Sequence, residues 1–574
     1  MLLQLKPSLH CSLFLGIALI LSSCARRGSP TGGPIDSIPP VLVNASPKMR
    51  TTNFNREEVV LIFDEFIKFK NLDKQLVISP PLEKSAYKIS PQTAASKKVT
   101  IEFLDSLQAQ TTYTINFGEA INDHNEGNVL PFFSYTFSTG DVIDSLTLGG
   151  QVADALMEVS EEYITLQMYP LIDSIPRDSM PFLMKPFYVT NTLDSIFFEF
   201  QNIREGTFEV IALKDRNFNY LFDPATDKIG FLEEPIRLPT DSLLTFRMFQ
   251  EILDFSWTRP FFINTNKIGI GYFGRYDDRP IEILSPVPND FRYMVNHVRE
   301  TDSLNFWITE HEGLDSLQLG LPMADSLQKY TVKFRQKTPD SLVLNPLRKG
   351  KLDLLEELVI EANRPLVGVD SSKVKLVNVD TLAVPFQLRL DENHDRLTVS
   401  FEKTPNDKYT LSLEPEALVD FWGETHDSLQ WIWRTKKIDT YGNIAIRMPW
   451  DFECPFVLQL LDEKGTEVIR EFTEEDPFGS YTFAYLNPGK YKVRVIEDCN
   501  GNQQWDTGHY LRKIQPERIS YYPPLLELRA NWDLNEQFIP FQKNPDPAET
   551  AVSGEAPPDA LPTTALVSNL LQIR

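Results

Sequence analysis

The chain has 574 residues, a formal net charge of −24 and 41 prolines. Such an acidic chain is a poor candidate for binding nucleic acid or an anionic membrane face through charge. Prolines break long helices, and the length allows four or five domains of about 100 residues each. We therefore expect a multidomain protein with few helices.

The first predicted element is a secretion signal. Residues 12–21 (SLFLGIALIL) follow the single charge of Lys6 and form an apolar run too short to span a bilayer as a permanent helix. The next residues, SSC, end at Cys24 and complete a segment that resembles the lipobox of bacterial lipoproteins. This resemblance implies removal of residues 1–23 and attachment of lipid to Cys24. The alternative is an ordinary secretory signal with an incidental cysteine.

The rest of the chain is predicted to be mostly strands. Residues 24–39 are rich in glycine, proline and serine, which is typical of an extended tether. Beyond them, short β-branched and aromatic runs such as VVLIF (59–63) recur between Pro, Gly, Asn and Asp, as they do in β-sandwiches. Only residues 71–76 and 414–420 have helical character. The predicted fold class is all-β, with tandem β-sandwich domains.

Two segments of the chain repeat as an ordered pair. Residues 112–139 align with residues 408–435 at a constant offset of 296, and residues 200–223 align with residues 483–506 at an offset of 283. Glycine, aromatic and polar positions are shared within each match. Two different β modules that occur twice in the same order indicate a chain assembled from small domains, none of which is obviously an active site. The domain between the pairs has no counterpart.

Both modules resemble known families. LIFDEFI (61–67), together with the segment YTINFGEAINDHNEGN that closes on YTFSTGD, resembles the bacterial Ig-like domain of S-layer proteins, which heads a group of uncharacterised lipoproteins from Bacteroidota. The resemblance is strongest over residues 28–140 and moderate over residues 345–437. Residues 147–240 and 439–540 resemble prealbumin-type sandwiches related to carboxypeptidase regulatory domains. These resemblances imply a fold, and they imply no reaction.

The predicted division of the chain follows from these segments. It comprises a signal peptide (1–23), a tether (24–39), an Ig-like domain (40–142), a prealbumin-like sandwich (143–244), a middle β domain (245–344), a second Ig-like domain (345–439), a second prealbumin-like sandwich (440–543) and a disordered tail (544–574).

The repeated loop D-x-N-x-N-x-x-[FW]-D offers oxygen donors at the alternating spacing of a calcium loop. Neither copy has glycine at position 6 or glutamate at position 12, so we expect any Ca²⁺ affinity to be weak, about 10⁻⁴ to 10⁻³ M. The alternative is a structural turn in which Asp and Asn accept hydrogen bonds from their own backbone. The donors are Asp215, Asn217, Asn219 and Asp223 in one copy, and Asp498, Asn500, Asn502 and Asp506 in the other.

The four cysteines have different expected fates. Cys11 leaves with the signal peptide and Cys24 carries the lipid. Cys454 and Cys499 are then exported to a compartment in which disulfides persist. They form either a disulfide or two separate buried thiols, because sequence alone does not show that their Cα atoms lie within about 7 Å.

Asp-Ser followed by an apolar residue recurs along the chain and resembles the O-glycosylation acceptor pattern of Bacteroidota. Asp-Ser is also a good turn before a strand, which accounts for most copies. We expect a few exposed copies to carry glycan. The candidate acceptors are Ser37, Ser145, Ser174, Ser179, Ser242, Ser316 and Ser428.

The sequence contains little that indicates catalysis. No H-E-x-x-H or G-x-S-x-G motif occurs, and Glu310-His311-Glu312 is the only cluster of acids with histidine, which we interpret as a solvated strand end. The middle domain contains FSWTRPFF (255–262) and GYFGRYDDRP (271–280). Their aromatic side chains form either a stacking platform for a sugar or peptide, or the core of a small sandwich.

These observations favour a non-enzymatic, lipid-anchored envelope protein that acts as a modular scaffold or interaction protein. Its expected partners are the membrane, reached through the lipid alone, and an envelope protein or glycan. Arg26-Arg27 after the lipidated cysteine favours the periplasmic face of the outer membrane over the cell surface. The alternative is a carbohydrate-binding lipoprotein of a glycan-uptake system, with the middle domain as receptor. An enzyme is the least favoured class.

Overall fold

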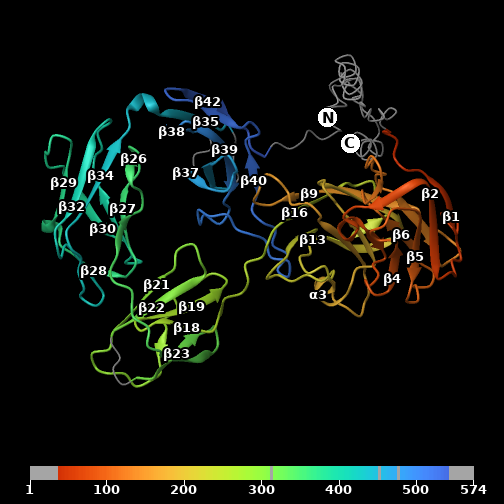
Figure 1. Ribbon diagram of the computed structural model, residues 1–574, viewed down its shortest axis with the longest axis horizontal. Coiled ribbons are helices and arrows are strands. Elements are labelled where there is room, and N and C mark those ends of the chain that lie inside the picture. Colours follow the sequence, from red (N-terminus) through yellow and green to blue (C-terminus); the bar gives the residue numbers. More distant parts are fainter. Residues whose placement is uncertain (1–35, 310–313, 450–453, 475–478, 542–574) are drawn as a thin grey trace, which may run out of the picture. The chain divides into compact units, whose positions relative to one another are not determined.

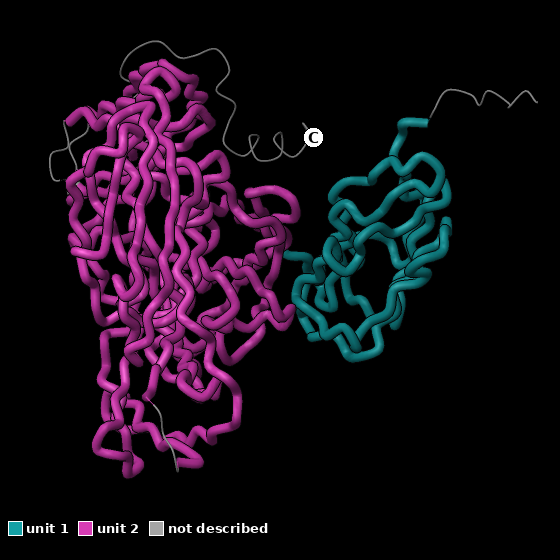
Figure 2. Tube along the Cα trace, turned by 60° about the vertical axis from the view of Figure 1, so that its left-hand side comes forward, with its two compact units in different colours: residues 1–144 teal, residues 145–574 magenta. Residues whose placement is uncertain are grey.

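The chain forms two compact units, residues 1–144 and residues 145–574, as Figure 2 shows. Nearly all the regular secondary structure of both units is strand and the helices are short (Figure 1), as predicted for an all-β chain of tandem sandwiches. Within the described ranges, no helix combines the length and the apolar character that a membrane span requires. The computed structural model describes residues 36–309, 314–449, 454–474 and 479–541.

Unit 1 is a sandwich of two sheets. One sheet has the strand order β1-β2-β5-β4, with β7 also on β2, and the other has the order β3-β6-β8. The predicted helical segment 71–76 contains the short helix α2 (Leu72–Gln75). The strands are β1 (Leu42–Ser46), β2 (Glu58–Phe69), β3 (Val77–Ser79), β4 (Tyr87–Ser90), β5 (Ser96–Phe103), β6 (Thr112–Asn116), β7 (Ile121–Asp123) and β8 (Ser134–Ser138).

Strand β2 shows why this sequence forms a sandwich. Val59, Leu61 and Phe63 are at most 1% exposed, whereas Ile62 between them is exposed. Side chains alternate between the faces of a pleated strand, so the first three pack against the opposite sheet. Tyr113 of β6 lies in the same core, and its hydroxyl accepts a hydrogen bond of 2.9 Å from the backbone N–H of Gln108.

Unit 2 begins with a second sandwich of two sheets. One sheet has the order β11-β10-β13-β14, with β15 on β13, and the other has the order β12-β9-β16. The strands are β9 (Leu146–Asp154), β10 (Thr165–Pro170), β11 (Tyr188–Asn191), β12 (Phe197–Ile203), β13 (Gly206–Lys214), β14 (Lys228–Phe231), β15 (Ile236–Leu238) and β16 (Leu244–Met248). Two short helices, η1 (Arg177–Ser179) and α3 (Met180–Leu183), lie between β10 and β11.

Strand β16 crosses the predicted boundary at residue 244. It pairs in parallel with β9, from Leu244 opposite Gly150 to Met248 opposite Asp154. Leu244, Phe246 and Met248 are all buried in the core of the sandwich. The second sandwich therefore continues through Met248, and the polar residues before β16 mark a turn within it.

The last sandwich repeats this plan strand for strand. Its sheets have the orders β37-β36-β39-β40, with β41 on β39, and β38-β35-β42, in which β35 and β42 are again parallel. The duplication thus covers all the strands of the module rather than the aligned loop alone. The strands are β35 (Gly442–Arg447), β36 (Phe456–Leu461), β37 (Val468–Glu474), β38 (Ser480–Leu486), β39 (Gly489–Glu497), β40 (Ile519–Tyr521), β41 (Leu526–Leu528) and β42 (Asp533–Gln537).

The second Ig-like domain repeats the plan of unit 1. The Tyr409 hydroxyl accepts a hydrogen bond of 2.7 Å from the Thr404 backbone N–H, as the Tyr113 hydroxyl does from Gln108. The predicted helix at 414–420 is wrong, because its end is a strand that pairs with β28. The strands are β25 (Leu344–Pro346), β26 (Gly350–Leu352), β27 (Leu358–Ala362), β28 (Leu366–Val369), β29 (Val374–Val377), β30 (Gln387–Leu390), β31 (Arg396–Ser400), β32 (Lys408–Leu413), β33 (Leu418–Asp420) and β34 (Leu429–Thr435).

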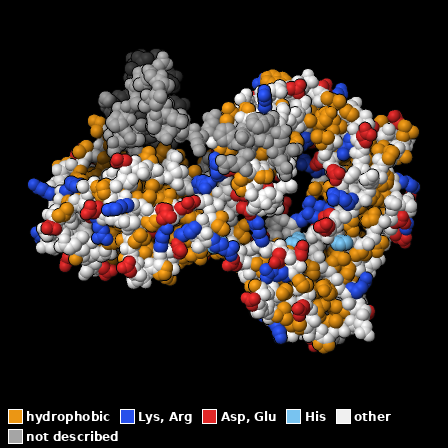
Figure 3. Space-filling view, turned by 180° about the vertical axis from the view of Figure 1, so that it is seen from behind, with side chains coloured by type: hydrophobic (Ala, Val, Ile, Leu, Met, Phe, Trp, Pro, Cys, Tyr) orange, Lys and Arg blue, Asp and Glu red, His pale blue; other side chains and the backbone are white. Residues whose placement is uncertain are grey.

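The middle domain has its own core and a different strand order. Its sheets are β17-β19-β22-β21, with β18 on β19, and β20-β23-β24. On the face of the molecule in Figure 3, acidic and basic side chains are interspersed over all parts of the surface that is drawn in colour. The strands are β17 (Ser256–Trp257), β18 (Phe261–Asn264), β19 (Lys267–Phe273), β20 (Glu282–Ile283), β21 (Tyr293–His297), β22 (Ser303–Ile308), β23 (Ser316–Pro322) and β24 (Leu327–Lys333).

Candidate functional site

The first Asp-Asn loop, residues 215–227 between β13 and β14, is closed by its own carboxylates. Asp215 accepts hydrogen bonds from the backbone N–H groups of Asn217 at 3.1 Å and Tyr220 at 2.7 Å. Asp223 accepts one from Ala225 at 3.0 Å. Burial raises the pKa of the Asp215 carboxyl, although the backbone hydrogen bonds oppose the rise.

The second Asp-Asn loop, residues 498–518 between β39 and β40, has the same local design. Asp498 accepts hydrogen bonds from the backbone N–H groups of Asn502 at 3.1 Å and Gln503 at 2.7 Å. Asp506 accepts hydrogen bonds from the side-chain amides of Asn500 and Asn502. These contacts join the two ends of the turn that the sequence predicts.

Most of the side chains predicted to hold calcium thus use an oxygen atom to accept a hydrogen bond within the turn itself. Side-chain oxygens of Asn219 and Asn500 also accept backbone N–H groups, from Leu221 at 2.8 Å and from Asn502 at 3.0 Å. Over the described part of the chain, no three His, Cys, Asp or Glu side chains are grouped as metal ligands. The geometry supports the structural turn, and calcium binding by these loops stays a prediction.

The second loop is longer than the first, and its extra length makes a separate element. The first loop has 13 residues and the second has 21, so the second contains an insertion of eight. The insertion forms a small hairpin in which the backbones of His509 and Ile514 exchange hydrogen bonds of 2.8 and 3.0 Å. We call residues 507–516 the clasp, because they reach from the last sandwich to the first prealbumin-like sandwich.

Tyr510 anchors the clasp. Its side chain is fully buried among apolar residues of the first prealbumin-like sandwich, on the outer face of the sheet formed by β10 and β13. Its ring lies 5.3 Å from the ring of Phe231 and 6.3 Å from that of Phe222. Phe222 is the core residue of the first Asp-Asn loop, so the two loops meet at this point.

A buried acid lies beside the anchor. Glu209 of β13 is 1% exposed, forms an ion pair with Arg177, and lies 3.5 Å from the Tyr510 hydroxyl. Burial raises the pKa of the Glu209 carboxyl, and the Arg177 guanidinium offsets only part of that rise. Burial also raises the pKa of the Tyr510 hydroxyl. The Tyr510 hydroxyl of the clasp thus lies beside a buried ion pair of the first sandwich.

The contact between the two prealbumin-like sandwiches is reciprocal. The turn after β9 lies against the outer face of the last sandwich, where the Leu156 carbonyl accepts a hydrogen bond of 2.7 Å from the Tyr521 hydroxyl. Glu158 of the same turn forms an ion pair with Lys492 of β39. Each copy thus contributes one turn that covers the outer sheet face of the other.

The Cys454 and Cys499 side chains form a disulfide, with their Cα atoms 4.8 Å apart. The bond links the start of the second Asp-Asn loop to the residue just before Pro455 and β36. At the corresponding place in the first copy, Arg216 forms an ion pair with Glu161 at 3.3 Å. The two copies therefore fasten the same end of the sandwich by different chemistry.

The middle domain is joined to the second Ig-like domain by the Asn393 side chain, which binds a backbone N–H and carbonyl as a neighbouring strand would. Asn393 accepts a hydrogen bond of 2.7 Å from the His297 backbone N–H and donates one of 3.0 Å to the His297 carbonyl. Arg299 forms ion pairs with Asp391 and Asp395 beside it. The ring nitrogen of Trp422 donates a hydrogen bond of 3.0 Å to the Ile308 carbonyl, so several polar contacts fix this junction.

Most aromatic side chains of the predicted stacking platform belong to the core. Trp257 and Tyr272 are buried, and Phe255 and Tyr276 pack against them with ring centroids 4.9 to 6.4 Å apart. Phe261 of β18 and Phe273 of β19 are exposed. Core packing accounts for the other four rings of this cluster. The cluster Glu310-His311-Glu312 lies outside the described residues.

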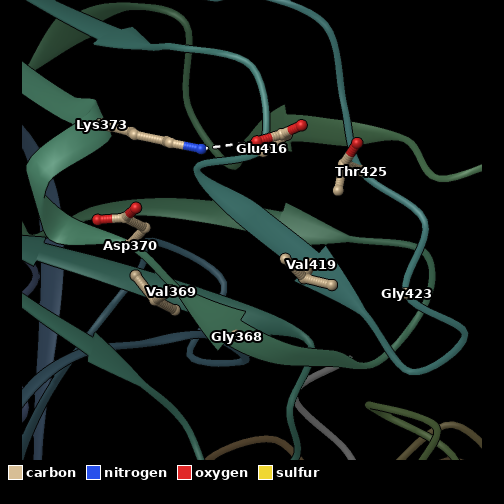
Figure 4. A pocket seen from close by; sticks show the side chains of 8 residues that line it. All are labelled: Gly368, Val369, Asp370, Lys373, Glu416, Val419, Gly423 and Thr425. Carbon is tan, nitrogen blue, oxygen red and sulfur yellow. Dashed lines mark hydrogen bonds and ion pairs between the residues drawn. The ribbon is translucent and has the colours of Figure 1, made fainter.

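The second Ig-like domain has an open hollow of about 400 Å³ (Figure 4). Gly368 and Gly423 leave space at its side, and Val419 lies between them. Lys373 and Glu416 form an ion pair of 2.8 Å at its edge. The lining thus combines paired charges with valine side chains.

The predicted modification sites differ in exposure. Cys24 lies outside the described residues. Among the predicted acceptor serines, most are at the surface and two are partly covered, which leaves the proposal of glycosylation open for each. Ser37, Ser145, Ser174, Ser242 and Ser428 are exposed, whereas Ser179 and Ser316 are half-buried.

Comparison with known protein families matches one domain of the chain. Residues 36–139 match the family described as the bacterial Ig-like domain. This range covers the described part of the unit 1 sandwich. No curated protein sequence matches the chain.

Solved structures align weakly over larger parts of the chain. The S-layer protein rSbsC(31-844) aligns at 10% identity over 68% of this chain and 66% of that chain, with a TM-score of 0.17. The N-terminal eight Ig domains of the Down Syndrome Cell Adhesion Molecule align at 9% identity over 87% and 61%, with a TM-score of 0.13. The chimeric titin Z1Z2 aligns at 11% identity over 32% and 96%, with a TM-score of 0.16.

The bacterial Ig-like domain and the tandem sandwiches are typical of modular scaffold or adhesion-like proteins, and such folds are typically non-enzymatic. Sequence reasoning missed the clasp. Once the strands of both copies are aligned, the eight extra residues before β40 provide the signal that points to it. Its target on the other sandwich has no such signal.

Proposed function

We propose that this protein is a lipid-anchored scaffold of the cell envelope that holds a partner through its stacked domains. The observation that carries this proposal is the reciprocal contact of the two prealbumin-like sandwiches through Tyr510 and Leu156. A chain whose domains fasten one another at specific side chains presents a defined surface, as a scaffold requires, whereas a passive spacer needs only flexible joints.

Anchoring through Cys24 and a position on the periplasmic face of the outer membrane are part of this proposal. The support comes from the apolar run 12–21, the cysteine that follows it, and Arg26-Arg27. The charge of −24 fits a domain held near a membrane by lipid rather than by basic side chains.

The test is recovery of the native lipoprotein after mild crosslinking in its own cells, with the Cys24→Ala variant as control. The expected result is one or a few specific envelope proteins captured from the membrane fraction with the wild type, and loss of the protein from that fraction in the variant. Recovery of no specific protein, together with binding of the purified chain to a glycan array, would overturn the scaffold in favour of a carbohydrate receptor.

A further inference from the structure

The clasp makes its contacts with the other half of unit 2 rather than with its own sandwich. The Thr507 hydroxyl donates a hydrogen bond of 2.7 Å to the Gln250 carbonyl, and the Tyr510 backbone N–H donates one of 2.5 Å to Glu251. Gln515 donates one of 3.0 Å to the carbonyl of Phe231. All three acceptors belong to the first prealbumin-like sandwich or to the segment that follows it.

The cores of the two sandwiches are complete without the clasp. Each sandwich has its own group of buried residues between its two sheets, and neither group includes a residue of the clasp. The group that contains Tyr510 is a separate one, on the outer face of β10 and β13, with Tyr169, Ile211 and Phe249 among its members. Loss of the clasp therefore removes Tyr510 from the outer group, uncovers the residues that remain there, and leaves both inner cores in place.

The clasp is held by one buried anchor and a rim of single polar contacts. Lys513 of the clasp forms an ion pair of 2.8 Å with Asp178, and Arg512 lies 3.5 Å from Asp254. The exposed pair of Arg512 and Asp254 contributes little, about 0 to 1 kcal/mol. The Lys513 Nζ is buried and lies 3.8 Å from the centre of the Tyr510 ring. Most of the binding free energy should then come from burial of the Tyr510 ring with Lys513 packed on it.

We infer that the clasp is a releasable lock, which opens as a unit and separates the two prealbumin-like sandwiches while both stay folded. Local opening proceeds through the elements with the fewest buried apolar contacts, and the clasp is such an element between two complete cores. Release leaves the two sandwiches connected through the chain between them. It also uncovers the apolar outer face of the first sandwich, with Phe231 and Phe249. This inference does not depend on the identity of the scaffold's partner.

The lock is tested by zero-length carbodiimide crosslinking of the full chain, read by mass spectrometry of linked peptides. The closed state joins Lys492 to Glu158, a pair that contains no residue of the clasp. In Tyr510→Ala we expect this crosslink to fall by more than about tenfold, because the buried anchor is gone and only the polar contacts of the turn after β9 remain between the sandwiches. Lys490 and Glu463, which lie 3.0 Å apart within the last sandwich, provide a crosslink that should not change.

Hydrogen exchange on the same variant separates opening from unfolding. We expect rapid exchange in residues 507–516 and unchanged protection in β10, β13, β36 and β39. Tyr510→Phe keeps the ring and should behave as the wild type in both measurements. An unchanged crosslink from Lys492 to Glu158 in Tyr510→Ala would overturn the lock, and so would loss of protection in the core strands of either sandwich.

Discussion

The two Asp-Asn loops share a local design and differ in what they contact. In both, an aspartate at the start of the loop binds backbone N–H groups. An aromatic residue of each loop packs in the apolar group on the outer face of the first sandwich, where Phe222 is a buried member and Trp505 is partly buried against it. The first loop ends there. The second continues into the clasp and reaches the first sandwich. The turn chemistry is therefore a property of the module, whereas the contact between modules comes from a short insertion in one copy.

The largest expected difference in stability between the two prealbumin-like sandwiches comes from the bond that holds the start of each Asp-Asn loop. Replacing both cysteines (Cys454→Ala with Cys499→Ala) should destabilise the last sandwich by about 4 kcal/mol, since the bond closes a loop of 45 residues. Hydrogen exchange of β36 and β39 measures the loss. Arg216→Ala removes the corresponding ion pair of the first sandwich. The free energy of unfolding measured at β10 and β13 should then change by less than about 0.5 kcal/mol. Equal losses in the two sandwiches would show that the fastenings are equivalent.

The next largest difference should be in the contribution to stability of the aromatic residue in each loop. Phe222 is 4% exposed, and Phe222→Ala should cost about 3 kcal/mol through the cavity that it leaves. Trp505 is only half-buried, so Trp505→Ala should cost less, about 1 to 2 kcal/mol. Chemical denaturation followed by exchange of β14 and β40 gives both values. A larger loss for Trp505→Ala would mean that the second loop depends more on its aromatic residue than its burial indicates.

At the tips of the two loops, substitutions at corresponding positions should have opposite effects on stability. Gly501 has φ of +70°, and Gly501→Ala should destabilise the last sandwich by about 1 kcal/mol because a Cβ is strained there. At the corresponding position Phe218 has φ of +55°, so Phe218→Gly should be neutral or stabilising by a few tenths of a kcal/mol. Denaturant midpoints measure both. A loss of more than about 1 kcal/mol in Phe218→Gly would assign the phenylalanine ring a packing role.

The smallest expected effect is on pH dependence, and its sign differs between the loops. For Asp506, burial would raise the pKa, but hydrogen bonds from Asn500 and Arg275 lower it overall. A lowered pKa gives stability that is present above the unfolded value of about 3.9 and is lost as pH falls through the folded value. The raised pKa of Asp215 gives the reverse, a cost at neutral pH that is relieved as pH falls through the folded value.

Unfolding of Asp506→Asn and Asp215→Asn at pH 7 and pH 3 tests these signs. The destabilisation caused by Asp506→Asn should shrink on acidification, because the wild type loses its advantage. For Asp215→Asn, the wild type should gain relative to the variant over the same range. The same sign of change for both variants would contradict the assignment.

The fold was open to prediction because its signals are local. Alternation in β2 and turn residues between strands can each be read within a few neighbouring residues. The constant offsets of the duplication then show that two such modules are repeated, and together these signals specify tandem sandwiches. The helix predicted at 414–420 failed because pairing of β33 with β28 outweighs the local preference of its residues. Strand β16 was assigned to the wrong domain because its partner β9 lies about 95 residues away.

The candidate site was predictable only in part. The Asp and Asn side chains of the loops were found from their spacing, although spacing alone left calcium and a structural turn as alternatives. The partners of Tyr510 and Asn393 were not found, since each binds a surface that is distant in sequence and carries no motif. Contacts between domains depend on complementary shape, which a single sequence does not record.

The parallel pairing of the first and last strands in each prealbumin-like sandwich has a mechanical consequence. β9 pairs with β16 through five residue pairs, and β35 pairs with β42 through five more. Tension applied to the two ends of such a sandwich pulls the paired strands past each other along their length. All five pairings then bear the load together, instead of breaking one after another. Under tension across unit 2, the sandwiches should thus keep their shape while the joints between them yield first.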